Sequence, residues 1–229
     1  MLYDKSMRRF KYYDLILALF AAVLLISNIS ATKVVSFGPI ITDGGAVLFP
    51  IIYILGDILT EVYGYKHARR AIWMGFIVML LGVIVFTIVR YLPPASVYTD
   101  QAAFEAVLGF FPRIVAASLV AYLVGEFTNS YILARLKVKS KGKHLWQRLM
   151  ASSVLGELFD TTIFAFIAFG GIIVGWEMVI YILVGWAFKT GVEFLFLPVT
   201  YRIINFLKRS ENIDHYDRKT DFSPFHFSA

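Results

Sequence analysis

The chain has 229 residues, a length that suits one or two soluble domains, but its composition is that of a membrane protein. Hydrophobic residues make up 59% and charged residues 17%, against about 45–50% and about 25% in soluble domains. A soluble core cannot bury so much apolar surface, so lipid is the expected solvent. The composition also excludes a disordered chain, and the absence of cysteine excludes a disulfide framework or a cysteine-ligated metal site.

Runs of about 20 mostly apolar residues, the length that crosses a bilayer as a helix, occur about six times along the chain. The predicted spans are 12–31, 46–64, 70–91, 111–135, 147–173 and 177–207. Pro50 and Pro198 are predicted kink sites within them. The predicted fold is an all-α, polytopic bundle of about six transmembrane helices. It forms one integral-membrane domain, 1–229, with a basic N-terminal segment, 1–11, and a tail, 209–229.

The net charge of +6 would suit nucleic-acid binding, but the positions of the basic residues indicate membrane topology instead. The N-terminal segment, the second and fourth connections and the tail hold 18 of the 22 lysines and arginines, all on one side of a six-span bundle. The positive-inside rule therefore predicts that both termini are cytoplasmic, in a multi-pass protein of the inner membrane. The basic run 137–143 is interpreted as part of this signal. The first span also has the pattern of a secretory signal peptide, although a retained helix is preferred.

Acidic residues inside the predicted spans are the feature that most needs explaining. They are Asp57, Glu61, Glu126, Glu157, Asp160 and Glu193. Each costs about 2.5–3.5 kcal/mol near the centre of a spanning helix, and Lys189 is the only clearly buried cation expected beside them. Such residues are expected to face one another, water or a ligand. Simpler interpretations stay open for some of them: an internal ion pair between Lys189 and Glu193, a solvated Glu61, or a purely structural role.

Three spans repeat one motif, a glycine, then an acid, then a second polar group three or four residues later. It occurs at 56–61, 125–130 and 156–161. This spacing puts both polar groups on one helix face, and the glycine allows a neighbouring helix to approach. All three motifs lie at a similar depth, so we expect them to meet. The candidate substrate-binding residues are Asp57, Glu126, Asn129, Glu157, Asp160, Asn28, Lys189, Glu193, Tyr53 and Trp186, and the candidate coupling or gating residues are Glu61, Thr60 and Thr161.

The chemistry of these residues favours binding over catalysis. The histidines at 67, 144, 215 and 226 all lie in connections or the tail, and no phosphate-binding Gly-Lys-Ser/Thr loop occurs. A membrane metalloprotease and intrinsic ATP hydrolysis are therefore disfavoured. Carboxylates accept hydrogen bonds from N–H donors, and an asparagine both donates and accepts. The expected ligand is a polar small molecule with adjacent N–H donors, such as a guanine-like edge, and the acids offer a route for proton coupling.

Several motifs together resemble the queuosine precursor transporter family, also called the vitamin uptake transporter family. The most specific piece is the run 57–64, Asp-Ile-Leu-Thr-Glu-Val-Tyr-Gly, supported by the motifs at 125–130 and 156–161. The resemblance covers the chain from the first to the last predicted span. It implies import of 7-deazaguanine precursors of the tRNA nucleoside queuosine, of the preQ0 or preQ1 type. It implies no enzymatic activity, and we expect no cofactor, no metal and no nucleic-acid partner.

The expected mechanism is a secondary carrier in which Glu126 or Glu157 holds the guanine-like N–H edge and Asn129 reads the carbonyl group. Lys189 and Glu193 would complete or gate the site. Two alternatives remain open. One is a substrate-binding membrane subunit that needs a separate ATP-hydrolysing module, and the other is an intramembrane hydrolase. The sequence also leaves open a homo-oligomer, the coupling ion and the identity of the transported precursor.

Overall fold

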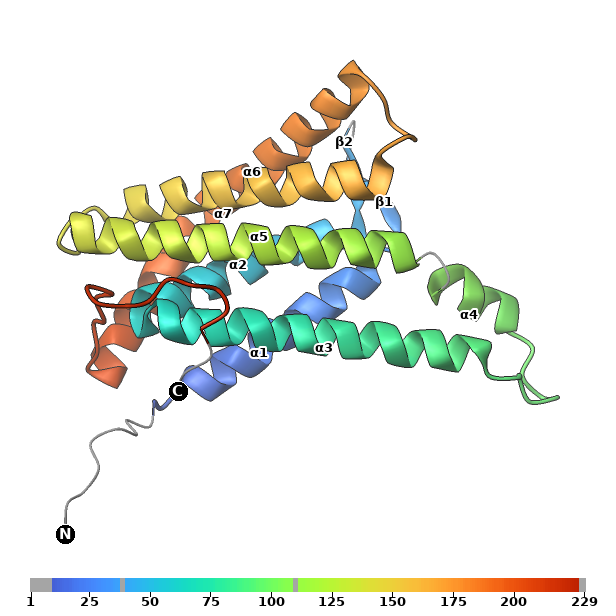
Figure 1. Ribbon diagram of the computed structural model, residues 1–229, viewed down its shortest axis with the longest axis horizontal. Helices are drawn as coiled ribbons and strands as arrows, with labels where there is room; N and C mark the ends of the chain where they lie inside the picture. Colours follow the sequence, from blue (N-terminus) through green and yellow to red (C-terminus); the bar gives the residue numbers. More distant parts are fainter. Residues whose placement is uncertain (1–9, 38–39, 109–110, 227–229) are drawn as a thin grey trace, which may run out of the picture.

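The computed structural model describes residues 10–37, 40–108 and 111–226, and most of them are helical (Figure 1). The N-terminal basic residues Lys5, Arg8 and Arg9 lie outside the described residues. In chain order the elements are α1 (Tyr13–Ser30), β1 (Val34–Phe37), β2 (Ile40–Asp43), the 3-10 helix η1 (Gly44–Val47), α2 (Phe49–Ile58), the π-helix η2 (Leu59–Tyr63), α3 (Tyr65–Tyr91), α4 (Gln101–Leu108), α5 (Phe111–Lys139), α6 (Leu145–Phe169) and α7 (Trp176–Glu211).

The helices have the length and the outward-facing side chains of a membrane protein. In the described part of the chain, α1, α3, α6 and α7 are each long and apolar enough to cross a bilayer. Large apolar side chains point outward from them, for example Leu15, Leu81, Phe166 and Leu195, which are 67%, 58%, 58% and 73% exposed. Lipid can cover such a surface and water cannot. The predicted fold class, an all-α membrane protein, is confirmed.

Each predicted span overlaps a helix, but the second span is built differently from the prediction. It divides into η1, the ten-residue α2 and the π-helix η2. Pro50 was predicted to kink a helix, and this is wrong because the residue lies in the first turn of α2, where the missing N–H costs nothing. Pro198, in contrast, lies inside α7. Gly64, with φ +88°, separates η2 from α3, which begins at Tyr65 rather than at residue 70.

Two short elements had no counterpart in the sequence analysis. The strands β1 and β2 form an antiparallel hairpin between α1 and α2, with Val34 opposite Asp43. The Gly44 N–H donates to the Lys33 carbonyl at 2.7 Å and closes the base of this hairpin. The eight-residue helix α4 has no buried residue and lies between α3 and α5. Both elements lie at the same end of the bundle (Figure 1).

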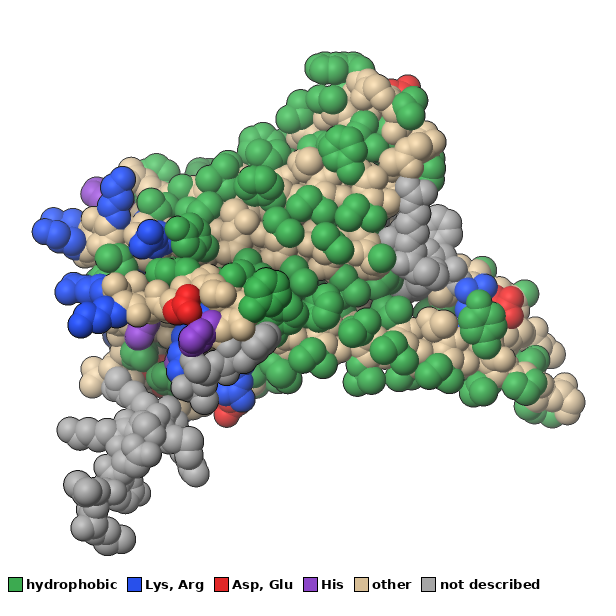
Figure 2. Space-filling view, viewed as in Figure 1, with side chains coloured by type: hydrophobic (Ala, Val, Ile, Leu, Met, Phe, Trp, Pro, Cys, Tyr) green, Lys and Arg blue, Asp and Glu red, His purple; other side chains and the backbone are tan. Residues whose placement is uncertain are grey.

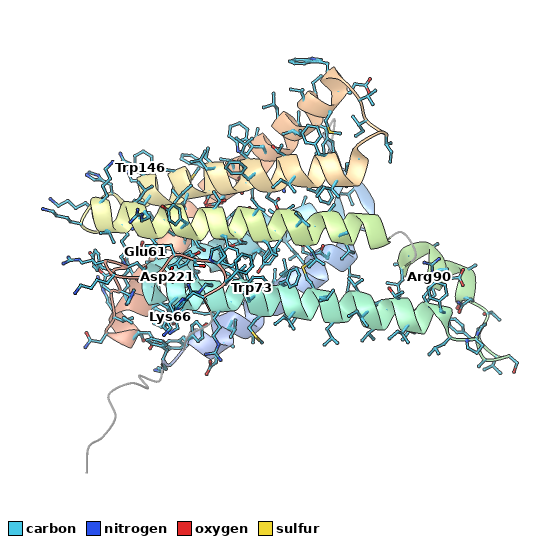
Figure 3. The ribbon with its side chains drawn as sticks, viewed as in Figure 1. Glu61, Lys66, Trp73, Arg90, Trp146 and Asp221 are labelled. Carbon is cyan, nitrogen blue, oxygen red and sulfur yellow. The ribbon has the colours of Figure 1, made fainter. Side chains whose placement is uncertain are left out.

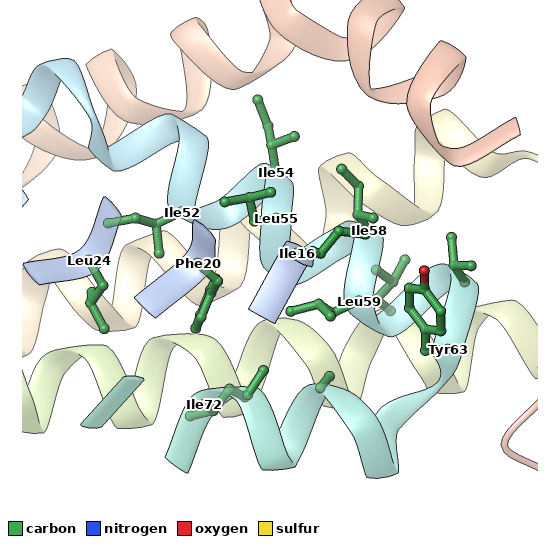
Figure 4. Close-up of a cluster of buried hydrophobic side chains, with 14 of the residues drawn as sticks. Ile16, Phe20, Leu24, Ile52, Ile54, Leu55, Ile58, Leu59, Tyr63 and Ile72 are labelled. Carbon is green, nitrogen blue, oxygen red and sulfur yellow. The ribbon is translucent and has the colours of Figure 1, made fainter. Parts of the chain in front are cut away.

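The apolar core lies between α1, α2, η2, α3 and α5. Figure 4 shows Phe20 and Leu24 of α1 near Ile52 of α2 and Ile72 of α3, and all four are 2% exposed or less. Leu59 of η2 is fully buried in the same cluster. This core fixes α2 against its neighbours, and α2 carries Asp57. The helix that positions one candidate site residue is therefore itself held by apolar packing.

The two ends of the bundle differ in charge. The starts of α1 and α3, the α5–α6 turn and the end of α7 share one end, where Figure 2 shows most of the lysine and arginine side chains. We call this the basic end. The opposite end carries the hairpin, α4 and the α6–α7 connection (Figure 1). The charge asymmetry that predicted cytoplasmic termini is therefore present in three dimensions, and the orientation in the membrane stays a prediction.

The tail after α7 folds back onto the start of α3, although its sequence carried no interpretable motif. The Tyr65 backbone N–H donates to Asp217 at 3.1 Å. The Arg69 guanidinium donates to the Asp221 carbonyl at 2.9 Å, and the Trp73 indole donates to the Pro224 carbonyl at 2.8 Å. Figure 3 shows Asp221 and Trp73 on this side of the molecule. The tail is thus part of the folded structure of the basic end.

Candidate functional site

Five acidic side chains from four helices lie buried in one region of the bundle. Asp57 comes from α2, Glu126 from α5, Glu157 and Asp160 from α6, and Glu193 from α7, and their exposed fractions run from 0% to 4%. Glu126 interacts electrostatically with Asp160, Glu193 and Glu157, and Asp57 interacts with Glu193 and Glu126. We call these five residues the carboxyl cluster. Acidic residues that are separated by up to 136 positions in the sequence therefore converge, as their similar depth predicts.

Glycines allow the helices that carry the cluster to approach closely. A Cβ atom on Gly156 of α6 would lie 2.8 Å from the Asn129 Cβ of α5 and 3.0 Å from the Gly125 carbonyl oxygen. A Cβ atom on Gly56 of α2 would lie 2.6 Å from a carboxyl oxygen of Glu126. Only a residue without a side chain fits at these contacts. The glycine of each repeated motif therefore makes room for the polar group of another.

Hydroxyl and amide groups from neighbouring helices hold one oxygen of several cluster acids. The Asn129 amide of α5 donates to Asp57 Oδ1 of α2 at 2.8 Å. The Thr190 hydroxyl of α7 donates to Glu157 Oε2 of α6, and the Ser153 hydroxyl of α6 donates to Glu193 Oε1 of α7. Each bond crosses between two helices. The acids are thus fixed in orientation by single contacts that leave their second oxygen available.

Those second oxygens have no donor within the described ranges 10–37, 40–108 and 111–226. The unpartnered buried atoms are Tyr53 Oη, Asp57 Oδ2, Glu126 Oε1 and Oε2, Asn129 Oδ1, Glu157 Oε1 and Glu193 Oε2. A buried polar group without a partner costs about 1–3 kcal/mol, so seven such atoms together are a large destabilising contribution. The carboxyl group of Glu193 also lies close enough to those of Glu157 and Asp57 to interact with them electrostatically, and a proton on one of them relieves the repulsion between like charges. The region is chemically complete only with added donors or protons.

Lys189 is the cation of this region, and it pairs across the helix interface. Its ammonium lies 2.8 Å from Asp160 Oδ2, 3.2 Å from the Thr161 hydroxyl and 3.8 Å from the centre of the Phe49 ring. The alternative of an ion pair along α7 with Glu193 is therefore replaced by a pair between α7 and α6. Phe49 was not predicted as a site residue, because an aromatic residue at the start of an apolar run carries no distinguishing signal.

Glu61 does not join the cluster, and its environment corrects two predictions. Both of its oxygens are bound by the guanidinium of Arg148, and Lys208 and Lys137 lie 2.6 Å and 3.4 Å from Oε1. Lys137 and Arg148 are only 1% and 3% exposed, so Lys189 is not the only buried cation. Lys137, which was interpreted as part of the topology signal, also pairs with Glu61. Glu61 itself is fully buried rather than solvated, and Figure 3 shows it toward the basic end of the bundle.

Three other predicted residues have local roles away from the cluster. The Asn28 amide donates to the Leu24 carbonyl at 2.9 Å and to Met79 Sδ at 3.3 Å, so it faces α3. The Trp186 indole donates to the Val154 carbonyl at 2.9 Å and joins α7 to α6. The Thr60 hydroxyl donates to the Gly56 carbonyl and shares a hydrogen bond with the Ser130 hydroxyl. The structure does not bring Asn28 to the carboxyl cluster, because depth along α1 alone did not determine which face of the helix carries it.

The side chains of the carboxyl cluster are almost completely buried in this conformation. Two hollows lie away from it: one beside Asn28 and Met79 between α1 and α3, and one open along Arg202 and Arg209 on α7. Within the described residues, no three histidine or carboxylate groups are arranged as metal ligands. The cluster therefore has the acceptors of a binding site, and a guest reaches these buried groups only if the helices around them move apart.

A family whose description reads "Putative vitamin uptake transporter" matches residues 43–203, a range that contains the entire carboxyl cluster. The chain belongs to the queuosine precursor transporter family. Membership makes it a multi-pass membrane transporter with a small-molecule substrate, which confirms the family that the motifs resemble.

Relatives within this family agree with that assignment. A protein of Bacillus subtilis (strain 168), named "Probable queuosine precursor transporter", is 30% identical over 177 residues, 76% of this chain and 77% of the relative. The "Queuosine precursor transporter" of Escherichia coli (strain K12) is 31% identical over 128 residues, 56% of this chain and 55% of the relative. The match to this second relative therefore spans about half of its length. No solved structure matches the chain.

Proposed function

We propose that the protein is a secondary carrier that imports 7-deazaguanine bases of the preQ0 and preQ1 type across the inner membrane. The imported base would supply the salvage of queuosine in tRNA. In this proposal the basic end faces the cytoplasm, as the positive-inside rule predicts. The names of the relatives and the motif at 57–64 support the substrate class, and the carboxyl cluster supports the place of binding.

The unpartnered oxygens of the cluster are the observation that carries the proposal. A guanine-like base presents adjacent N–H donors on one edge and a carbonyl acceptor beside them. Glu126 has two buried oxygens without a donor, so it is the group best suited to accept both N–H bonds at once. Tyr53 has a buried, unpartnered hydroxyl that can donate to the carbonyl. A ligand of this kind satisfies atoms that the protein leaves without partners.

The structure changes the role expected of Asn129. One N–H of its amide donates to Asp57, whereas its Oδ1 is unpartnered. In this proposal Asn129 accepts a bond from the base through this oxygen. Tyr53 takes over the donor role. Asp57, Glu157, Asp160, Lys189 and Thr161 complete the lining in this proposal, and Glu193 joins them through α7.

Charge in the cluster favours protons as the coupling ion. Five buried carboxyl groups share one ammonium, Lys189, among the residues of the cluster region that the structure describes. Several unpaired negative charges cannot remain together in an apolar environment, so part of the cluster carries protons. Glu193 reaches both Glu157 and Asp57, and a proton that moves between these groups can be released when the substrate binds or leaves. A proton gradient would then drive import without ATP.

Uptake in cells that cannot synthesise queuosine tests the proposal. Cells that express the protein and receive preQ0 or preQ1 are expected to contain queuosine-modified tRNA, and cells without the protein are not. Glu126→Gln and Glu157→Gln are expected to abolish the modification. Glu177→Gln, which changes an exposed acid at the start of α7, serves as the control. Unchanged tRNA modification with and without the protein would refute the function.

Purified protein in liposomes separates the secondary carrier from its alternatives. Accumulation of intact base without nucleotide, driven by a pH gradient, is expected. A requirement for a separate ATP-hydrolysing module would support the modular importer instead, and conversion of the base would support a hydrolase.

A further inference from the structure

Two lysines bridge two carboxylates at the basic end, one in the bundle and one in the tail. The Lys137 ammonium of α5 lies 2.7 Å from Asp214 Oδ1 and 3.4 Å from Glu61 Oε1. The Lys208 ammonium of α7 lies 2.8 Å from the same Asp214 oxygen and 2.6 Å from the same Glu61 oxygen. Asp214 belongs to the tail and Glu61 to η2. At Asp214 the tail is therefore connected to the bundle through lysines that it shares with Glu61.

Arg148 of α6 completes this arrangement. Its guanidinium binds both oxygens of Glu61, and it also donates to the carbonyls of Lys143 and Gly142 in the α5–α6 turn, at 3.0 Å and 3.2 Å. Lys137 donates in addition to the backbone carbonyl of Glu61 at 2.6 Å. We call Glu61, Lys137, Arg148, Lys208 and Asp214 the inner latch. Each charged group of the latch has a partner of opposite charge, and Asp214, whose side chain is 45% exposed, is its outermost member.

The tail is anchored beyond Asp214 by several independent contacts. Asp217 accepts the Tyr65 N–H, and Arg69 holds the carbonyls of Asp221 and Ser223 at 2.9 Å and 2.8 Å. The His215 ring lies so close to Gly64 that a side chain at position 64 would collide with it. Burial favours a raised pKa for Asp214, but hydrogen bonds from Lys137 and Lys208 keep that pKa below its usual value. Asp214 therefore stays charged at neutral pH.

The inner latch joins the same elements that form the carboxyl cluster. Segment α2–η2 provides Asp57 to the cluster and Glu61 to the latch, four residues apart, with the start of the π-helix between them. Helices α5, α6 and α7 likewise provide Glu126, Glu157 and Glu193 to the cluster and Lys137, Arg148 and Lys208 to the latch. The helices cannot separate on the side of the basic end while these ion pairs hold.

We propose that the inner latch, with the tail as its outer part, is the gate that closes the carboxyl cluster toward the basic end. This inference rests on the proposed function, because a gate has meaning only for a carrier that releases its substrate on that side. Release requires that the Lys137 and Lys208 pairs to Asp214 and Glu61 break. The tail is then not a passive extension of α7, since Asp214 provides one of the two carboxylates that hold the gate shut.

The absence of cysteine gives a direct test, because a single introduced thiol is the only one that can be labelled. Ser152→Cys places that thiol at a fully buried position one turn beyond Arg148, since the Ser152 hydroxyl donates to the Arg148 carbonyl. Its reaction with a membrane-impermeant maleimide reports how often the basic end opens. Lys139→Cys, at an exposed position near the end of α5, identifies the vesicles whose basic end faces the reagent.

Asp214→Asn in the Ser152→Cys protein is expected to accelerate labelling about tenfold, the effect of removing hydrogen bonds to a charged group. Deletion of residues 214–229 is expected to accelerate it at least as much. Asp221→Asn is the matched control, because it removes a charge from the same tail while Asp221 binds Arg69 through its backbone carbonyl and its side chain contacts Ser223 and His226 within the tail. Equal labelling rates for Asp214→Asn and the unaltered tail would overturn the proposal, whatever the deletion does.

The labelling needs no substrate, so it fails or succeeds independently of the proposed function. Faster labelling in Asp214→Asn would support the gate. If the unaltered protein then took up neither preQ0 nor preQ1, the proposed substrate would be refuted while the gate would stand. If the unaltered protein took up the base normally but substitutions in the latch did not change the labelling rate, the carrier function would stand and the gate would be refuted.

Discussion

Two regions of the bundle bury acids and surround them in opposite ways. Glu61 in the inner latch is fully buried and surrounded by Arg148, Lys208 and Lys137. Glu126 in the carboxyl cluster is 1% exposed and has no donor for either oxygen among the residues that can be described. Both arrangements use the same helices. The difference shows that the chain is able to satisfy a buried carboxylate and does not do so in the cluster.

This contrast separates a structural role from a binding role. A buried ion pair loses several kcal/mol when one partner is removed, because the remaining charge has no compensation. Substitution of an acid that already lacks hydrogen-bond donors removes little stabilisation from the folded state. Such an acid gains most when a ligand supplies the missing donors. Substitutions in the latch should therefore affect stability first, and substitutions in the cluster should affect transport first. The predictions below compare the two regions on both measurements.

Arg148→Met is expected to produce the largest effect, a loss of about 3 kcal/mol in the free energy of unfolding. The substitution keeps the aliphatic packing and leaves Glu61 with two lysines in place of three cations. Thermal unfolding in detergent measures the loss. Arg202→Met, at an exposed position on α7, is the control and should unfold like the unaltered protein. Equal stability of the two variants would show that the pairing of Glu61 contributes nothing to the fold.

Glu126→Gln is expected to have the opposite result, a large loss of uptake without a loss of stability. Uptake of the base should fall about 100-fold, the loss of a pair of hydrogen bonds to a charged group, while the unfolding temperature stays the same or rises. The rise is expected because a neutral amide adds donors to a region that lacks them. Initial uptake rates and thermal unfolding of the same preparation provide both values. A stability loss as large as that of Arg148→Met would show that the cluster, like the latch, acts mainly on the stability of the fold.

The sequence predicted the cluster better than the latch for a physical reason. The cluster acids lie in motifs with a shared spacing and depth, so a count along each helix places Asp57, Glu126 and Glu157 in one layer. The latch depends on contacts across long separations, such as the 87 residues between Glu61 and Arg148. Basic residues near a membrane surface are expected for topology alone. The sequence therefore gave no reason to assign Lys137 and Arg148 to one acid.

Other parts of the fold could not be predicted from the periodicity of apolar residues along the chain. The apolar run 46–64 has the length of a span, but its pattern does not show where α-helix changes to π-helix. Asn28 is polar within an apolar helix, and only the packing of α1 against α3 shows that it bonds locally. The docking of the tail depends mainly on backbone carbonyls, such as those that bind Arg69, and these carry no sequence signal.

Gly156→Ala is expected to disturb both measurements by a moderate amount, because the glycine contact holds α5 against α6. The new methyl group would meet the Asn129 Cβ and the Gly125 carbonyl, and such overpacking costs about 1–3 kcal/mol. Uptake should also fall, since Asn129 would shift relative to Asp57. Gly191→Ala is the matched control on α7, where no atom lies within 4 Å of the added methyl. If the two alanine variants had the same stability and the same uptake, the close contact between α5 and α6 at Gly156 would be excluded.

The smallest expected effect is the acid sensitivity of the tail, which concerns Asp217. Burial favours a raised pKa for this carboxyl, but hydrogen bonds from His215, Thr220 and the Tyr65 backbone hold the pKa below its usual value. A lowered folded-state pKa means that the stabilisation is complete above the unfolded-state pKa of about 3.9 and is lost as the pH falls through the folded-state pKa. Protease cleavage of the tail should therefore be slow at neutral pH and increase only in acid.

Asp217→Asn tests this dependence because its side chain cannot titrate. Its tail should be cleaved faster than the unaltered tail at neutral pH, and the rate should change little between pH 6 and the acid range in which the unaltered tail is released, about pH 4 and below. An acid-stable protease such as pepsin covers that range. Asp221→Asn controls for the loss of one charge from the tail. If the unaltered tail were released already near neutral pH, charge on Asp217 would not be what holds it, and the docking would have to rest on the carbonyl contacts to Arg69 and Trp73.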